Sequence, residues 1–293
     1  MIYDVAIIGT GPAGFSAAMN VKIHNKTILW IGAPGLSEKI TKAEKIMNYP
    51  GLPAVSGQEM RAIFSQQAAD MGLTIHDAMV NSILPFGSHY ALMAGNDFFE
   101  AKSIILATGI TNTSILPGEE DLVGTGVSYC ATCDGGLYRG KKIAVICNAR
   151  RFAHEVSFLA SLAETVYFFP GYADAGCMED NVIQMATSPN AILGEKKVTG
   201  ISCADGSILD VDGVFCLRDT ISLHTLLPGL QTENNHIAVD RQMRTNLPGI
   251  FAAGDCTGRP YQYVKAAGEG NIAAHSVIAY LANQESLQPT QNR

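Results

Sequence analysis

Two cysteines in the stretch SYCATCDGG have the spacing needed for redox chemistry. Cys130 and Cys133 are separated by two residues, and Asp134 follows directly. Thiols at this spacing can close a disulfide across one turn, and one thiolate can attack an incoming disulfide while the other resolves it. Asp134 could supply and remove the proton. A zinc site would need two further ligands, and there is no second C-x-x-C. We therefore predict a catalytic dithiol and no metal.

The other cysteines and the histidines show no comparable pattern. We expect five cysteines to be buried, small apolar residues without a redox role: Cys147, Cys177, Cys203, Cys216 and Cys256. No pair of histidines has metal-ligand spacing. His154 and Glu155 are expected on the polar face of a helix over 151–163.

The stretch IIGTGPAG predicts a dinucleotide-binding turn between a strand and a helix. Gly9 permits the tight turn, Gly11 lets a pyrophosphate approach the backbone, and Gly14 allows close packing of helix and strand. The phosphates would lie at the positive end of the helix. The acidic residue expected about 20 positions later for the ribose is missing. The nearest candidate is Glu38, in the following loop.

Two further apolar stretches end in small residues that a flat cofactor could approach. IILATG ends at Thr108 and Gly109, and GIFAAGD ends at Gly254 and Asp255. The Asp255 carboxylate could accept hydrogen bonds from ribityl hydroxyls. A helix beginning near Tyr263 would direct its positive end at an isoalloxazine ring. The three stretches in this order predict FAD.

Strand and helix patterns alternate along the chain, which predicts an α/β fold with largely parallel sheets. The strand–helix–strand opening recurs with KKIAVI, RRFAHEVSFLASLA and TVYFF. We therefore expect two Rossmann-like, three-layer nucleotide-binding domains, the second inserted in the first. The FAD-binding domain would be 1–111 plus 243–293, ending in a long helix through Tyr280 and a loose polar tail. The inserted redox domain would span 112–242 and carry the C-x-x-C motif.

Composition excludes several classes of function. Hydrophobic residues make up 47% of the 293 residues and charged residues only 16%, so a large core is expected. The net charge of −7 argues against general nucleic-acid binding. No stretch is long and apolar enough for a membrane span, and the N-terminus lacks a signal-peptide pattern. We expect a cytoplasmic protein.

The motifs GTGPAG, MNYPG, ILATG, CATCDG and GIFAAGDC occur in the order of the low-molecular-weight thioredoxin reductases, and the chain resembles that family over nearly its whole length. The resemblance implies an FAD-containing homodimer. It gives Cys133 as the flavin-facing thiol, Cys130 as the thiol that meets thioredoxin, and Asp134 as the acid. It also implies the residues that line FAD: Gly9, Gly11, Pro12, Ala13, Asn48, Thr108, Gly254 and Asp255.

The second nucleotide-binding loop departs from the family pattern. Cys147, Ala149 and Phe152 occupy the places of a G-x-G-x-x-A loop for NADPH, and a phenyl ring there would obstruct the pyrophosphate. The arginines expected for the 2′-phosphate are also missing, since 152–195 contains no Lys or Arg. The family's arginine–glutamine pair before the last helix is replaced by Gln262 and Tyr263, which we expect beside the cofactor with Val264.

These departures resemble the pyridine-nucleotide-independent branch, the ferredoxin-dependent flavin thioredoxin reductases. Five basic residues without an acid among them could dock an acidic ferredoxin, or could simply form a solvated face: Arg139, Lys141, Lys142, Arg150 and Arg151. The leading hypothesis is electron flow from ferredoxin through FAD and the dithiol to thioredoxin. Three alternatives stay open: an NADPH-dependent reductase with an atypical loop, a diflavin disulfide oxidoreductase with a second FAD, and a degenerate flavin-binding regulatory protein.

Overall fold

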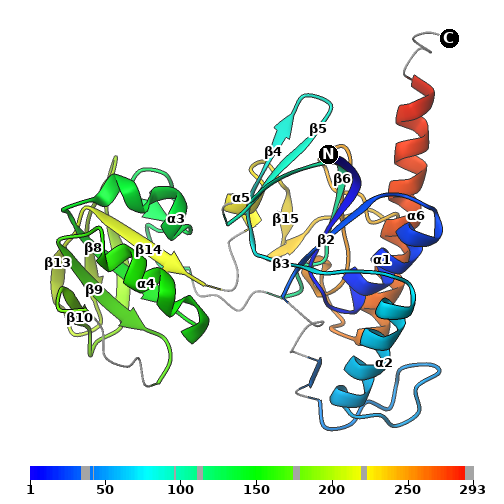
Figure 1. Ribbon diagram of the computed structural model, residues 1–293, viewed down its shortest axis with the longest axis horizontal. Coiled ribbons are helices and arrows are strands. Elements are labelled where there is room, and N and C mark those ends of the chain that lie inside the picture. The colour runs from blue at the N-terminus through cyan, green and yellow to red at the C-terminus, as the bar shows by residue number, and fades with distance from the viewer. Residues whose placement is uncertain are drawn as a thin grey trace. The chain divides into compact units, whose positions relative to one another are not determined.

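The computed structural model describes residues 1–33, 40–41, 43–95, 97–110, 115–173, 179–218 and 223–287. Contacts divide the chain into two compact units, Met1–Thr111 with Leu227–Arg293, and Asn112–Leu226. The fold is mixed α/β with parallel sheets, as the sequence predicts (Figure 1). Within the described parts of the chain, no helix is both long enough and apolar enough to span a membrane.

The first unit is built on one seven-stranded sheet with strands in the order β3-β2-β1-β6-β5-β4, and β17 also pairs with β6. Its strands are β1 (Ile2–Ile8), β2 (Ile28–Gly32), β3 (His76–Asp77), β4 (Val80–Phe86), β5 (His89–Ala94), β6 (Asp97–Leu106) and β17 (Ile250–Ala252). A small hairpin, β15 (Thr232–Glu233) and β16 (His236–Ile237), precedes β17.

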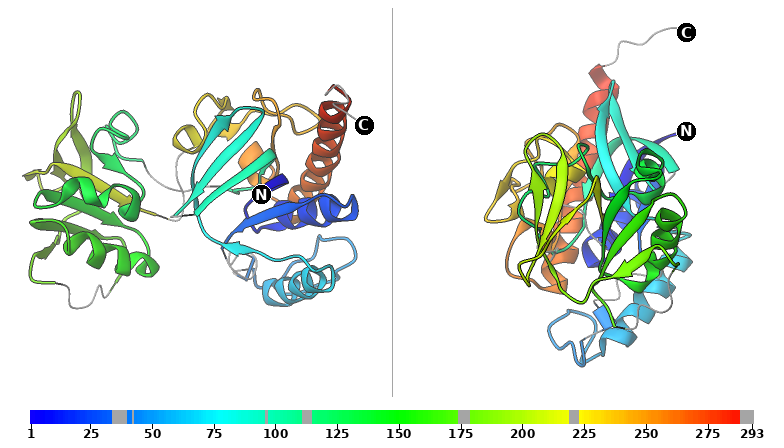
Figure 2. Two further views of the ribbon diagram at one scale, coloured as in Figure 1. Left: turned by 45° about the horizontal axis from the view of Figure 1, so that its top comes forward. Right: turned by 90° about the vertical axis from the view of Figure 1, so that its left-hand side faces the viewer.

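Three helices cover this sheet: α1 (Pro12–Ile23), α2 (Gly57–Asp70) and α6 (Tyr263–Leu287). Helices α1 and α6 lie side by side (Figures 1 and 2). Their approach is close, because a Cβ at Gly270 would lie 2.1 Å from the Ala13 carbonyl oxygen. The core beneath them includes Phe15, Trp30 and Phe251.

The second unit contains two sheets. A parallel sheet has the order β10-β9-β8-β14-β7, and an antiparallel sheet has the order β11-β12-β13. The strands are β7 (Val127–Ser128), β8 (Lys142–Cys147), β9 (Thr165–Pro170), β10 (Val182–Gln184), β11 (Pro189–Gly194), β12 (Val198–Cys203), β13 (Ile208–Asp210) and β14 (Gly213–Leu217). Its helices are α3 (Ala131–Asp134), α4 (Ala153–Ala160) and α5 (Leu223–Leu226).

Short 3₁₀ turns join several of these elements: η2 (Gly135–Tyr138), η3 (Arg150–Phe152) and η4 (Asp255–Thr257). The core of the second unit lies between the parallel sheet and α4, and includes Val145, Val156 and Phe168. The three-stranded sheet lies on the other side of the parallel sheet (Figure 2).

Three boundaries differ from the sequence-based expectation. Residues 227–242 group with the first unit, where the side chain of Val239 packs against its core. The helix expected over 151–163 begins as η3 and continues as α4 only to Ala160. The last helix continues past Tyr280 to Leu287, because the polar sequence after Tyr280 contains no helix breaker.

Candidate functional site

Cys130 and Cys133 form a disulfide, with their Cα atoms 5.3 Å apart. Cys130 occupies the N-cap position of α3, and its Sγ accepts a hydrogen bond from the Cys133 N–H at 3.2 Å. Cys130 is 9% exposed, whereas Cys133 is exposed. The two sulfurs of the pair therefore differ in accessibility.

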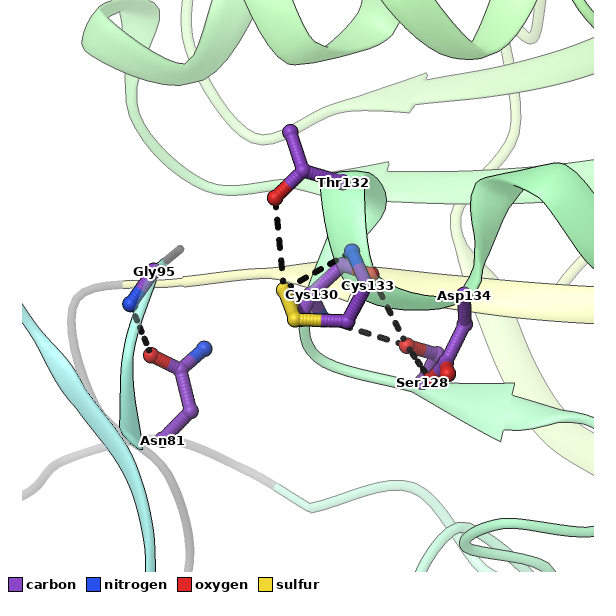
Figure 3. Close-up of a disulfide and its surroundings, with 7 residues drawn as sticks. All are labelled: Asn81, Gly95, Ser128, Cys130, Thr132, Cys133 and Asp134. Carbon is purple, nitrogen blue, oxygen red and sulfur yellow. Dashed lines mark hydrogen bonds between the residues drawn. A yellow bond between two sulfur atoms is a disulfide. The ribbon is translucent and has the colours of Figure 1, made fainter. Parts of the chain in front are cut away.

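The hydroxyl of Ser128 joins Asp134 to the dithiol segment. Ser128 Oγ donates to Asp134 Oδ2 at 2.7 Å and accepts from the Cys130 N–H at 3.1 Å (Figure 3). Thr132 Oγ1 lies 3.5 Å from Cys130 Sγ. The predicted acid is thus held against the turn that carries both sulfurs. Ser128 is not one of the residues that the motif requires, so no sequence signal indicates this contact.

Behind the dithiol, a buried ion pair connects distant segments of the second unit. Arg218 Nη2 donates to Glu119 Oε2 at 2.8 Å, and the Tyr129 hydroxyl donates to Glu119 Oε1 at 2.8 Å. Both charged side chains are almost fully buried. Burial, followed by the Glu119 charge, raises the pKa of the nearby Cys216 thiol to about 12. This cluster fixes the segment just before Cys130.

The loop after β8 contains no glycine, and a buried side chain lies at each of its ends. Cys147 is fully buried, and its Sγ donates to the Ala149 carbonyl oxygen at 3.3 Å. Phe152 is 9% exposed and lies in the hydrophobic core of its unit. The Tyr172 hydroxyl contacts the Cys147 side chain, and burial raises its pKa. Residues 148–152, all of which the structure describes, therefore form no open glycine turn before α4.

The loop after β1 is open by contrast. Gly9 has φ +116°, and a Cβ there would lie 2.1 Å from the Ala107 carbonyl oxygen. A Cβ at Gly14 would lie 2.0 Å from the Gly9 carbonyl oxygen, whereas one at Gly11 would meet nothing within 4 Å. Gly11 caps α1 without a side-chain hydrogen bond, so the first N–H groups of that helix can receive phosphate. This turn fits a dinucleotide.

Parallel pairing places the three cofactor stretches at one edge of the sheet. Ile8 aligns with Leu106, and Leu106 aligns with Ala252. The stretches ending at Gly9, Gly109 and Asp255 therefore follow neighbouring strands at their carboxyl ends, where open α/β sheets bind ligands.

The remaining predicted cofactor residues that the structure describes lie near this edge. Asn48 Nδ2 donates to Gln262 Oε1 at 2.6 Å. Burial, followed by the charge of Asp255, raises the pKa of Tyr263, the first residue of α6. Val264 is exposed beside it. Glu38, the candidate ribose acid, lies outside the described residues.

A lysine that the sequence analysis did not single out holds the loop after β17. Lys265 Nζ donates to the carbonyl oxygens of Gly254 at 2.9 Å and Gly258 at 2.8 Å, and pairs with Glu269. Glu269 also accepts from the Gly254 N–H at 2.8 Å. The pair fixes the glycine at which the backbone turns with φ +93°.

The cysteines and the basic residues differ in how far they follow expectation. Cys147, Cys203, Cys216 and Cys256 are buried free thiols, as predicted, and Cys177 lies outside the described residues.

The five basic residues are all exposed, but β8 separates them. Arg139, Lys141 and Lys142 lie before or at its start, and Arg150 and Arg151 lie after its end. The two groups are roughly 17 Å apart along the strand, so they do not form one continuous patch.

No cluster of three or more potential metal ligands occurs among the residues that the structure describes. Glu155 departs from expectation, because burial raises the pKa of its carboxyl group and the carboxylate contacts the dithiol helix. It does not lie on a solvated polar face.

The sequence profile of the pyridine nucleotide-disulphide oxidoreductase family matches residues 3–270. Thioredoxin reductase of Listeria monocytogenes is 33% identical over 98% of this chain and 97% of its own length. Thioredoxin reductase of Bacillus subtilis is 31% identical over 99% of this chain and 97% of its own length.

Solved structures give a matching result. A ferredoxin-flavin thioredoxin reductase from Clostridium acetobutylicum is 42% identical, with a TM-score of 0.88 over 98% of this chain and 99% of that chain. A thioredoxin reductase from Gloeobacter violaceus is 28% identical, with a TM-score of 0.77 over 99% of this chain and 98% of that chain.

Proposed function

The chain belongs to the pyridine nucleotide-disulphide oxidoreductase family, and we propose that within it the protein reduces thioredoxin, or a similar dithiol protein, with electrons from reduced ferredoxin. The coarser activity, that of a flavin-dependent disulfide oxidoreductase of the thioredoxin reductase type, follows from the relatives. The donor, the acceptor and the roles of individual residues are the proposal.

The observation that carries the proposal is the contrast between two loops, one after β1 in the first unit and one after β8 in the second. The loop at Gly9–Gly14 has the open backbone that a pyrophosphate needs, whereas the loop at Cys147–Phe152 contains no glycine and has the buried side chains of Cys147 and Phe152 at its two ends. One nucleotide site is therefore supported and the second is not. The similarity to a ferredoxin-flavin enzyme supports the same donor.

FAD fits the first unit and would be held by the turn Gly9–Gly14, by Thr108 and Gly109, by Gly254 and Asp255, and by Asn48 with Gln262, Tyr263 and Val264. When bound, FAD can accept single electrons from an iron–sulfur donor and deliver a pair to a disulfide. Plant-type ferredoxins have potentials near about −400 mV and thioredoxin near about −270 mV, so transferring two electrons is downhill by roughly 6 kcal/mol.

The chain's own residues carry the exchange with the protein substrate. The roles of the two thiols are those that the family resemblance implies: Cys130 meets thioredoxin and Cys133 faces the flavin. The Cys130 thiolate attacks the substrate disulfide and forms a mixed disulfide, and the departing thiolate takes a proton from Asp134. Cys133 then attacks Cys130 Sγ, which releases the reduced substrate and restores the Cys130–Cys133 disulfide.

An anaerobic titration of the purified flavoprotein tests the donor. Reduced ferredoxin, NADPH and NADH are added in separate runs while flavin absorbance is recorded, and oxidised thioredoxin follows. We expect bleaching by ferredoxin alone and recovery on addition of thioredoxin. Rapid bleaching by NADPH would contradict ferredoxin as the donor and would support the NADPH-dependent alternative.

A homodimer and a cytoplasmic location, both expected from the sequence, belong to the same proposal. The dimer is testable by light scattering.

A further inference from the structure

Glu155 lies where α4 passes the helix that carries the dithiol. Its carboxylate accepts a hydrogen bond from the Ala131 N–H, in the first turn of α3. The next turn of α4 touches the same segment, because a Cβ at Gly135 would lie 3.2 Å from Phe158 and 3.1 Å from Leu159. Glu155, Phe158 and Leu159 therefore form one face of α4 that lies against residues 131–135.

The first turn of α3 thus serves two acceptors. The Ala131 N–H donates to the Glu155 carboxylate, and the Cys133 N–H donates to Cys130 Sγ at 3.2 Å. Each of these hydrogen bonds stabilises a negative charge on its acceptor. In the reduced protein, an ionised Glu155 and a thiolate at Cys130 would be two like charges on adjacent N–H groups of one turn and would repel each other.

Other ionisable groups lie on the elements packed against α4, and their charges also act on this turn. Burial raises the pKa of Glu155, and the charge of His154 and the hydrogen bond from Ala131 oppose that effect. The ionisable groups on α3, η3, β8 and β9 are Cys130, Cys133, Asp134, Arg150, Arg151, Lys142, Cys147 and Tyr167. Asp134, whose carboxylate accepts a hydrogen bond from Ser128, is one carboxylate beside the dithiol. Glu155 is a second.

We propose that Glu155 is a positioning residue of the dithiol, whose carboxylate disfavours a thiolate at Cys130 and so keeps the Cys130–Cys133 pair strongly reducing. The inference rests on the proposed role of this pair in reducing a protein disulfide. Reduction of the disulfide takes two electrons and leaves two sulfurs that must share protons. Where one sulfur stays ionised, a nearby negative charge makes the reduced form less stable, and the electron pair passes more readily to an acceptor disulfide.

Three variants separate the charge of Glu155 from its hydrogen bond. Glu155→Gln keeps an acceptor oxygen for the Ala131 N–H but removes the charge, and Glu155→Ala removes both. Glu164→Gln makes the same charge change at an exposed position beyond the end of α4 and serves as the matched control. Each holoenzyme is reduced with dithiothreitol, and iodoacetamide alkylation rates at Cys130 and Cys133 are followed from pH 5 to pH 10 by peptide mass spectrometry.

We expect Glu155→Gln to lower the apparent pKa of alkylation at Cys130 by about one unit, the effect of removing one nearby like charge. At a pH where the thiolate is populated, the equilibrium with dithiothreitol should shift about tenfold towards the reduced protein. Glu155→Ala should show the same shift, and Glu164→Gln should match wild type.

An unchanged or raised apparent pKa in Glu155→Gln would overturn the proposal. So would a profile that changes only in Glu155→Ala, because the hydrogen bond and not the charge would then be responsible. The assay uses neither ferredoxin nor thioredoxin. Its outcome is therefore independent of the titration that tests the electron donor.

Discussion

Ser128 Oγ lies 2.7 Å from Asp134 Oδ2 and 3.1 Å from the backbone nitrogen of Cys130, so one hydroxyl connects the proposed acid to the dithiol. The first prediction concerns that acid. Asp134→Asn removes the proton that the departing thiolate of thioredoxin needs, and we expect the rate of thioredoxin reduction to fall about 100-fold. Reduction of the flavin by ferredoxin should stay close to wild type in stopped-flow absorbance.

Asp210→Asn is the control for this variant, since Asp210 is an exposed carboxylate of the same unit. Ser128→Ala should cause a smaller loss than Asp134→Asn, because the acid remains but its position is no longer fixed. Full thioredoxin reduction by Asp134→Asn would remove Asp134 from the proposed mechanism.

The second prediction assigns the two thiols. The family resemblance implies that Cys130 meets thioredoxin, so Cys130 should form the mixed disulfide. A Cys133→Ser protein should accumulate that mixed disulfide with a thioredoxin lacking its resolving cysteine. Cys130→Ser should form little. Non-reducing electrophoresis followed by peptide mapping gives the answer. The opposite pattern would assign the attack to Cys133, which is exposed, whereas Cys130 is 9% exposed.

The third prediction concerns the two groups of basic residues that β8 separates. Arg150 and Arg151 lie at the carboxyl end of the parallel sheet, the same end as the dithiol segment after β7. In the proposed mechanism, electrons enter the disulfide at that end. We expect Arg150→Glu with Arg151→Glu to raise the KM for ferredoxin about tenfold at a moderate ionic strength of about 0.1 M.

Arg139→Glu with Lys141→Glu makes the same change in net charge at the other end of the strand. This pair should leave the KM for ferredoxin within about twofold of wild type, because charges that far apart are screened at moderate salt. Equal effects of the two double variants would indicate that net charge alone matters. They would contradict docking of ferredoxin at Arg150 and Arg151.

The parts of this protein that follow from sequence are those with a local signature. The glycines of the first loop, the C-x-x-C motif and the apolar strand stretches each need specific residues within a few positions. The contacts that sequence missed join residues far apart in the chain. Glu119 meets Arg218 and Gln262 meets Asn48 through tertiary pairing, and no spacing rule identifies such partners.

Glu155 illustrates the same limit. Its position beside His154 is typical of a polar helix face, yet α3 packs on that side of α4 and half-buries the carboxylate. The basic residues illustrate a different limit. They are close in sequence, but a strand of six residues carries its two ends to opposite edges of the sheet.

The fourth prediction tests the buried ion pair. Glu119→Gln leaves Arg218 buried without its counter-charge, which costs about 3–5 kcal/mol. The single tryptophan, Trp30, is buried in the first unit. In urea, the transition followed by far-ultraviolet circular dichroism should therefore move to lower concentration, while the Trp30 fluorescence transition changes little. A double variant, Glu119→Leu with Arg218→Met, should recover much of the loss. Equal stability of Glu119→Gln and wild type would contradict a structural role for the pair.

The fifth prediction concerns the cysteines outside the dithiol. Burial raises the pKa of Cys216 to about 12 and that of Cys256 to about 11, so both stay protonated at pH 8. Because the thiolate is the reactive form, N-ethylmaleimide should leave both unmodified in the native protein. After reduction, Cys133 should be labelled first and Cys130 more slowly. Peptide mapping before and after denaturation in urea gives the comparison. Rapid native labelling of Cys216 or Cys256 would show that these thiols are accessible and ionised, and would reopen a redox role for them.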